Sequence, residues 1–186
     1  MKSTESSGRA YSPTDPRFKR YTNSGVTGIC YHDGGIPPLR LSAFIIDNPD
    51  LFRGMSILDF GVGSGVNNIA LCRAGYPVAG LDREPLFLDM ARRVQALNHT
   101  TYELHQGSTD ELEGLDFDVL TVNQLFYNQE RLGDVLDLLD RLPAGKVALL
   151  SSDPSWPNDY KGFVKLRKLL GSEATHWSPY IMQVIT

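Results

Sequence analysis

The clearest chemical pattern in this chain is a carboxylate followed by three closely spaced glycines. The run Asp59-Phe60-Gly61-Val62-Gly63-Ser64-Gly65 joins a short apolar segment to a helical pattern. Glycine permits a tight turn and lets a ligand approach the backbone, and the first turn of a helix presents N–H groups that have no partner inside the helix. Several nucleotide-binding folds use such a junction, so the run predicts a site for a nucleotide-like cofactor.

The spacing of the glycines separates the known kinds of glycine-rich turn. A dinucleotide fingerprint, G-x-G-x-x-G/A, needs a small third residue where Val66 stands, and a P-loop needs a lysine that does not follow these glycines. The acid-x-G-x-G-x-G pattern resembles motif I of the class I S-adenosylmethionine (AdoMet) methyltransferases, which implies AdoMet as the cofactor. The residues that this resemblance assigns to the cofactor site are Asp59, Gly61, Gly63 and Gly65. A glycine-rich turn without a ligand is the alternative.

Asp82 is the second chemical signal, because it closes the next β-type run, Pro77-Val78-Ala79-Gly80-Leu81-Asp82. Open α/β folds place a carboxylate there that accepts hydrogen bonds from ribose hydroxyls. The methyltransferase resemblance extends the cofactor site to the neighbouring Arg83. It also places Ser108 near the adenine, since the resembling enzymes read the adenine edge with the loop after the third strand. An ordinary turn fits Ser108 equally well.

A parallel sheet would bring these residues together. From Ser56 onward, short β-rich runs alternate with helical patterns, which is typical of parallel strands joined by crossover helices. The strands are expected at 56–60, 77–82, 102–105, 117–122 and 146–151, with a closing antiparallel pair at 174–177 and 180–185. We therefore expect a single-domain α/β, Rossmann-like class I methyltransferase fold with a mostly parallel sheet. A short helix before it is expected to end near Asp47, because Asn48-Pro49 follows.

The first 25 residues differ from the rest of the chain. They are rich in Ser, Thr, Pro and charge and carry few periodic apolar positions, which predicts a flexible N-terminal arm over 1–25. The AdoMet-binding methyltransferase domain is then expected over 26–186.

The composition narrows the range of partners. The 186 residues are 41% hydrophobic and 22% charged, which is typical of a globular domain. A net charge of -4 without a run of Lys and Arg disfavours nucleic acid as a partner. The cysteines and histidines lack metal-ligand spacing, so no metal is expected. No segment has the pattern of a secretory signal or a membrane span, so we expect a cytoplasmic protein that acts on a small molecule or a protein.

A closer resemblance appears in the segments that flank the glycine turn. Over roughly residues 31–160 the chain is similar to the seven-strand lysine methyltransferases related to the electron-transfer-flavoprotein β-subunit lysine methyltransferase, a group also described as predicted nicotinamide N-methylases. The segments that carry the similarity are 34–35, 44–50, 53–54, 57–61, 81–85, 117–120 and 125–127. The resemblance implies that Gly34 and Gly35 contribute to the cofactor site.

The acceptor side departs from that group. Where the lysine methyltransferases carry a segment of the type Asp-x-Phe-Tyr-Asp, this chain has Gln124-Leu125-Phe126-Tyr127-Asn128. A carboxylate could hold a lysine ammonium by a charge-assisted hydrogen bond, whereas the amide of Gln124 can only orient a substrate. The residues predicted to contact the acceptor or the methyl donor are Asn123, Gln124, Tyr127 and Asn128. Of these, Asn123 also belongs to the predicted cofactor site.

These patterns predict methyl transfer to a small-molecule nucleophile, with an amine or amino-acid-like acceptor favoured. Because the leaving group of AdoMet is neutral, positioning of the two reactants can supply much of the catalysis. Other functions remain open: a protein-lysine methyltransferase, an enzyme that uses AdoMet for alkyl transfer or cyclisation, and a non-catalytic AdoMet-binding subunit.

Overall fold

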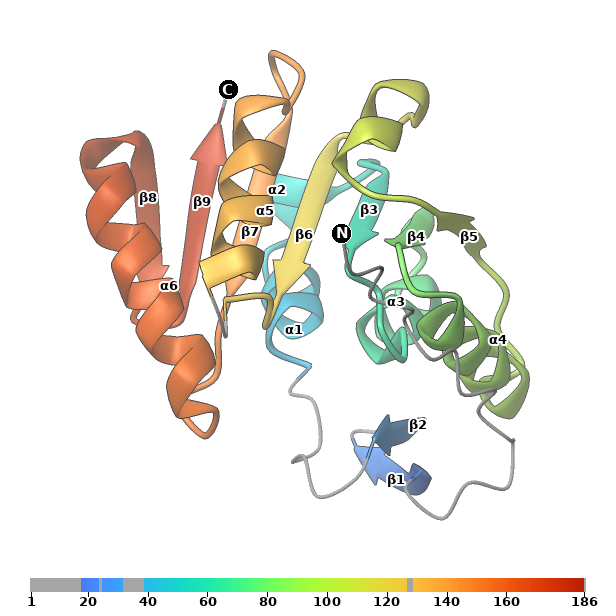
Figure 1. Cartoon of the computed structure of the whole chain (residues 1–186). Coiled ribbons are helices and arrows are strands. Elements are labelled where there is room, and N and C mark those ends of the chain that lie inside the picture. Colours follow the sequence, from blue (N-terminus) through green and yellow to red (C-terminus); the bar gives the residue numbers. More distant parts are fainter. Residues whose placement is uncertain (1–17, 24, 32–38, 127–128, 186) are drawn as a thin grey trace, which may run out of the picture.

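The computed structural model describes residues 18–23, 25–31, 39–126 and 129–185. Its centre is a seven-stranded sheet with the strand order β5-β4-β3-β6-β7-β9-β8 (Figure 1). The strands of this sheet are β3 (Ile57–Phe60), β4 (Val78–Asp82), β5 (Glu103–Gln106), β6 (Val119–Asn123), β7 (Val147–Ser151), β8 (Ala174–Ser178) and β9 (Ile181–Ile185). Strands β3 to β7 pair in parallel, and β9 runs antiparallel to both β7 and β8. The predicted mostly parallel sheet with a closing antiparallel pair is confirmed.

Helices cover both faces of the sheet. One face packs against α5 (Gln129–Asp140) and α6 (Pro157–Leu170) through a large apolar cluster. The other face packs against α1 (Arg40–Asp47), α3 (Val66–Arg73) and α4 (Pro85–Asn98). The shorter helical segments are α2 (Pro49–Phe52), η1 (Thr109–Gly114) and η2 (Gly171–Glu173). Because both faces are covered, the central strands β3, β6 and β7 are buried along most of their length and carry mainly apolar residues, as parallel strands usually do.

Local sequence explains several helix ends. Helices α4 and α6 begin with a proline, which fits the first helical position because its missing N–H has no partner there. Helix α1 ends at Asp47, as predicted, directly before Asn48 and Pro49. In the described part of the chain, no helix is both long and apolar enough to cross a bilayer.

The order of the strands creates a crevice between β3 and β6. The chain runs from β3 outward through β4 to β5 and then returns to β6 on the other side of β3. The loops that leave β3 and β6 therefore run in opposite directions from the same edge of the sheet, which is where open α/β sheets bind ligands. Of the predicted site residues, the described ones that follow β3, β4 and β6 lie at this edge.

An antiparallel hairpin of β1 (Phe18–Asn23) and β2 (Val26–Tyr31) precedes the sheet. The sequence predicted no fixed structure up to residue 25, and this prediction is wrong for the residues of β1. Residues 1–17 lie outside the described residues, so the arm stays a prediction there.

Contacts with distant helices explain the hairpin. Asn98, the last residue of α4, accepts a hydrogen bond from the Thr27 N–H (3.0 Å) and donates one to the Thr27 carbonyl (2.6 Å). Arg73 of α3 donates to the Gly25 carbonyl at 2.7 Å. These partners are far away in the sequence, so the local composition of the segment could not reveal them.

Candidate active site

A pocket of about 380 Å³ lies at the carboxyl ends of β3, β4 and β6. Its size falls within the roughly 300–1,000 Å³ typical of small-molecule sites. The predicted site residues that line it are Asp59, Gly61, Gly63, Asp82, Arg83, Ser108, Asn123 and Gln124. Gly65 is the described site residue that does not line it. The fold thus brings together residues that the sequence places in four separate segments.

The three glycines of the turn have different structural roles. Gly61, Gly63 and Gly65 have left-handed φ angles of 73°, 53° and 68°, which strain any residue with a Cβ. A Cβ on Gly61 would lie 2.5 Å from Leu125 Cδ1, and one on Gly65 would overlap the Tyr102 hydroxyl. A Cβ on Gly63 would meet no atom closer than 3.8 Å. The turn therefore needs Gly61 and Gly65 for packing, whereas Gly63 leaves open space in which a ligand can approach the backbone.

Asp82 is a nearly buried carboxylate at the end of β4, with 7% of its surface exposed. Its Oδ2 accepts the Gly63 N–H and its Oδ1 accepts the Glu84 N–H, both at 3.0 Å. Burial raises the pKa of Asp82, while these two backbone donors and the charge of Arg131 oppose the increase. Each carboxylate oxygen has about two lone-pair directions, so each keeps one for a ligand donor. Asp82 can therefore bind a pair of hydroxyl groups.

Asp59, the acid of the glycine motif, is also buried. Its Oδ1 accepts a hydrogen bond from Thr121 Oγ1 at 2.8 Å. Burial raises the pKa of Asp59 to about 7; the bond from Thr121 opposes the increase and the charge of Asp82 adds to it. A positively charged ligand would favour the ionised form of this carboxyl.

A network of charged side chains borders the pocket. Arg83 Nε lies 3.6 Å from Glu84 Oε1, and the two terminal nitrogens of Arg83 lie 3.3 Å from Glu130 and 3.5 Å from Asp134. Arg131 also lines the pocket and pairs with Asp134 at 3.4 Å. The sequence predicted Arg83 as a site residue but not Arg131, because a charged residue on a helix is usually exposed to solvent. Its position on the first turn after the predicted acceptor segment was the available signal.

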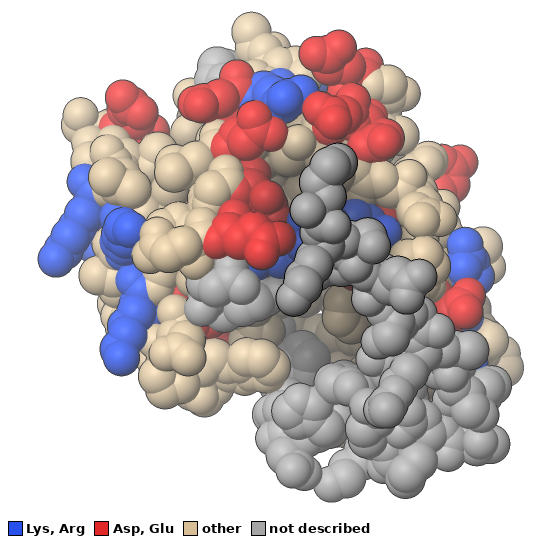
Figure 2. Space-filling view, viewed as in Figure 1, with Lys and Arg blue, Asp and Glu red and all other residues tan. Residues whose placement is uncertain are grey.

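Acidic side chains gather on the face of the molecule around this network (Figure 2). Those exposed on η1 and α5 are Asp110, Glu111, Glu113, Glu130, Asp137 and Asp140. Arg141 pairs with Asp110 at 2.7 Å and with Asp137 at 3.0 Å. These carboxylates give this face a negative local potential.

Ser108 has a structural role besides its position at the pocket. Its hydroxyl accepts the Glu111 N–H, and the Glu111 carboxylate accepts the Ser108 N–H at 2.5 Å, so the two residues form a capping box for η1. The predicted contact of Ser108 with an adenine edge stays a prediction.

The segment after β6 forms the predicted acceptor side. Asn123 Oδ1 accepts the Ser151 hydroxyl at 2.6 Å, and the Gln124 N–H donates to the Ser151 carbonyl at 3.0 Å. Gln124 has a φ of 58°, which is uncommon for a residue other than glycine. Its Nε2 is buried, and among the described residues no atom accepts a hydrogen bond from it. Since a buried donor without a partner is costly, a ligand with an acceptor atom fits this position.

Four other predicted site residues, Gly34, Gly35, Tyr127 and Asn128, lie outside the described residues. Their roles stay predictions. Within the described ranges, no group of three His, Cys, Asp or Glu side chains could hold a metal ion. Trp156, which precedes α6, also lines the pocket.

The sheet order, the glycine turn and the carboxylate of Asp82 define an α/β fold with a site for a nucleotide-like cofactor at its crevice. A family model described as a methyltransferase domain matches residues 51–185. The chain belongs to this family, which confirms the class of domain that the glycine motif predicted.

Similar proteins agree with this family. A ribosomal protein L11 methyltransferase of Burkholderia ambifaria is 29% identical over 123 residues, which cover 66% of this chain and 40% of that protein. The chain thus spans less than half the length of this curated relative.

Two solved structures share the fold. The 16S rRNA N2 G1207 methyltransferase of T. thermophilus, in complex with AdoMet and guanosine, is 20% identical with a TM-score of 0.64, over 91% of this chain and 50% of that one. The tRNA (uracil-54, C5)-methyltransferase of Pyrococcus abyssi, in complex with S-adenosyl-L-homocysteine, is 22% identical with a TM-score of 0.60, over 90% of this chain and 43% of that one.

Proposed function

We propose that this chain transfers a methyl group from AdoMet to a nitrogen atom of a small amine or amino-acid-like molecule. The observation that carries the cofactor assignment is Asp82, whose two carboxylate oxygens are each fixed by one backbone N–H at 3.0 Å. The two remaining acceptor directions match the two hydroxyls of a ribose. Membership of the methyltransferase family supports the same cofactor.

The residues around the pocket fit AdoMet in charge and in shape. Asp82 would hold the ribose, and the open space beside Gly63 would admit the cofactor close to the backbone. AdoMet carries a sulfonium and an ammonium group, and the carboxyl of Asp59 supplies a negative charge when it is ionised. When bound, AdoMet would supply an electrophilic methyl group whose departure leaves a neutral thioether.

The chain's own contribution is then mainly to hold the acceptor in line with that methyl group. Good alignment can contribute on the order of 7–11 kcal/mol to lowering a barrier. The buried Nε2 of Gln124 can donate to a carbonyl or carboxylate oxygen of the acceptor. An amino-acid-like molecule has such an oxygen close to its amine, which is why we favour it.

A protein acceptor is the second candidate. The relative from Burkholderia ambifaria is named for a protein acceptor, and the acidic face in Figure 2 would attract a basic segment. The narrower resemblance to the electron-transfer-flavoprotein β-subunit lysine methyltransferase group belongs to this candidate, although Gln124 lacks the charge that would hold a lysine. The two similar structures are named for RNA acceptors, and the same acidic face disfavours one here.

Incubation with methyl-labelled AdoMet tests the proposal. The pure protein is offered a metabolite pool, a protein lysate and total RNA in separate reactions. We expect label in the small-molecule fraction and S-adenosylhomocysteine as the released nucleoside. Label confined to a protein band would favour the second candidate, and label in RNA would contradict both. Release of methylthioadenosine would show alkyl transfer, and tight binding of AdoMet without turnover in any reaction would indicate a non-catalytic subunit.

A further inference from the structure

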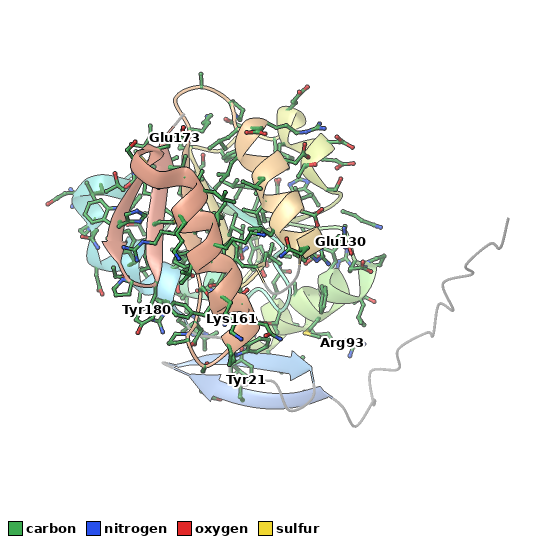
Figure 3. The ribbon with its side chains drawn as sticks, turned by 60° about the vertical axis from the view of Figure 1, so that its left-hand side comes forward. Tyr21, Arg93, Glu130, Lys161, Glu173 and Tyr180 are labelled. Carbon is green, nitrogen blue, oxygen red and sulfur yellow. The ribbon has the colours of Figure 1, made fainter. Side chains whose placement is uncertain are left out.

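Asp159 is a buried carboxylate outside the pocket, on the first turn of α6. It is 1% exposed. Figure 3 looks onto α6, with Lys161 on its first turns and Tyr180, of the turn between β8 and β9, near the same end of the sheet. A buried carboxylate costs free energy, and here burial raises the pKa of Asp159 while its two hydrogen-bond donors, Ser152 and Phe126, oppose the increase. Such a group needs a structural or functional reason.

The first contact of Asp159 fixes the predicted acceptor segment. Its Oδ1 accepts the Phe126 N–H at 2.7 Å, two residues after Gln124. The backbone of Phe126 lies directly on α6, because a Cβ on Gly162 would overlap the Phe126 carbonyl. The rings of Phe126 and Phe163 meet edge to face at 5.3 Å. The segment after β6 is thus held on α6 by one hydrogen bond and a close backbone contact.

The second contact of Asp159 reaches the segment after β7. Its Oδ2 accepts the Ser152 hydroxyl at 2.5 Å, and the Ser152 N–H donates to the Tyr180 carbonyl at 3.2 Å. Asp159 therefore joins two segments that leave neighbouring strands and face the same pocket through Gln124 and Trp156.

We propose that Asp159 is a positioning residue for the acceptor: it sets where Gln124 lies relative to the transferred methyl group and has no contact with the cofactor itself. This inference rests on the proposed function. A small displacement of the acceptor segment would change alignment with the methyl group far more than it would change binding of the cofactor.

Two ligands separate these effects. S-adenosylhomocysteine lacks the methyl group, whereas sinefungin is an analogue that carries an amine at the position of that methyl and so reaches the acceptor side. In Asp159→Ala we expect the Kd of S-adenosylhomocysteine to stay within about threefold of the wild type and the Kd of sinefungin to rise about tenfold or more. Asp159→Asn, which keeps an acceptor for the Phe126 N–H and a donor toward Ser152, is expected to restore most of the sinefungin affinity.

Asp118 provides the matched control. Its Oδ2 accepts the Ser56 N–H at 2.8 Å and the Ser56 hydroxyl at 2.9 Å, so Asp118 also accepts one backbone and one hydroxyl hydrogen bond, but away from the pocket lining and from a single residue. Asp118→Ala is expected to leave the ratio of the two dissociation constants unchanged. Equal changes for both ligands in Asp159→Ala, or a changed ratio in Asp118→Ala, would overturn the inference.

Hydrogen exchange tests the contact without any ligand. Exchange at the Phe126 amide is expected to rise in Asp159→Ala and not in Asp118→Ala; unchanged exchange in Asp159→Ala would overturn the positioning role. If Asp159→Ala does not fold, Ser152→Ala takes its place, with an expected rise of about threefold in the Kd of sinefungin alone. If the wild-type protein binds neither ligand but exchanges slowly at the Phe126 amide, the proposed function is refuted while the contact of Asp159 with Phe126 stands. Failure of the proposed function can therefore be distinguished from failure of this inference.

Discussion

At the level of single residues, the three glycines of the turn share a left-handed backbone conformation but have different neighbours. Substitutions at Gly61 and Gly65 should therefore lower mainly the stability of the protein, whereas a substitution at Gly63 should lower mainly its affinity for the cofactor. A substitution at any of them adds backbone strain, which costs about 1–2 kcal/mol in the left-handed region. Only at Gly63 does the added Cβ enter free space at the pocket rather than another side chain.

Gly63→Ala should therefore weaken the binding of S-adenosylhomocysteine by about tenfold or more, while its loss of unfolding free energy stays limited to the backbone strain.

Gly65→Ala should lose a further ~1–3 kcal/mol of unfolding free energy beyond the backbone strain, because its Cβ overlaps the Tyr102 hydroxyl. The double variant Gly65→Ala/Tyr102→Phe removes that hydroxyl and should recover part of the loss. Calorimetry measures the affinity of Gly63→Ala for S-adenosylhomocysteine, and unfolding in denaturant measures the stability of each variant. A double variant no more stable than Gly65→Ala would show that the overlap is not the cause.

Asp59 predicts a pH dependence of stability. Its pKa is about 7 in the folded protein, against the ordinary value of 3.8. Between these values the folded state binds more protons than the unfolded state, so the contribution of Asp59 to the unfolding free energy falls as pH rises from about 4 to about 7. Asp59→Asn removes this titration and should gain stability relative to the wild type across that range, by on the order of 2–4 kcal/mol.

Unfolding in denaturant at several pH values checks this expectation. Asp82 and Asp159 also have raised pKa values, so the quantity to compare is the difference between the variant and the wild type. A difference that does not change with pH would contradict the role of Asp59.

At the level of an element, the segment between β6 and α5 allows the effect of a substitution on stability to be compared with its effect on activity. Gln124 and His99 are the described non-glycine residues with positive φ, at 58° and 50°. Replacement of either by glycine should relieve backbone strain and raise the unfolding free energy by up to about 1 kcal/mol. Methyl transfer should fall in Gln124→Gly, which loses the amide at the pocket, and stay unchanged in His99→Gly. Equal activity of the two variants would argue against a role of Gln124 in the acceptor site.

Asn98 of α4 is one of the side chains that hold the β1–β2 hairpin on the helices. Asn98 makes hydrogen bonds to both backbone groups of Thr27, at 3.0 and 2.6 Å. Asn98→Ala leaves these groups without that partner and should cost about 1–3 kcal/mol. Hydrogen exchange should rise across 18–31 and stay low in β3. If the hairpin keeps its protection in the variant, contacts other than Asn98 hold it.

These elements also show what the sequence could predict. The central strands were predictable because strands buried on both faces are continuous apolar runs, and the helices between them showed apolar periodicity. The hairpin was missed because its supports, Asn98 and Arg73, are distant in the sequence.

For the whole molecule, one side of the pocket could be predicted from the sequence better than the other. The cofactor side is built from one contiguous turn and a strand-end carboxylate, whose spacing is visible in the sequence. The proposed acceptor side combines Gln124, Arg131 and Trp156, which line the pocket together only when α5 and α6 pack on the sheet. The role of Asp159 could not be predicted from the sequence either, because its hydrogen-bond partners belong to two other segments.

Binding of S-adenosylhomocysteine, measured by calorimetry beside NAD, is the most direct test of the cofactor site. We predict that the wild-type protein binds S-adenosylhomocysteine and not NAD, and that Asp82→Ala weakens binding by about 10- to 100-fold, since it removes charge-assisted hydrogen bonds to the ribose. A protein that binds NAD but not S-adenosylhomocysteine, or an Asp82→Ala variant that binds S-adenosylhomocysteine as tightly as the wild type, would contradict the AdoMet site at this crevice.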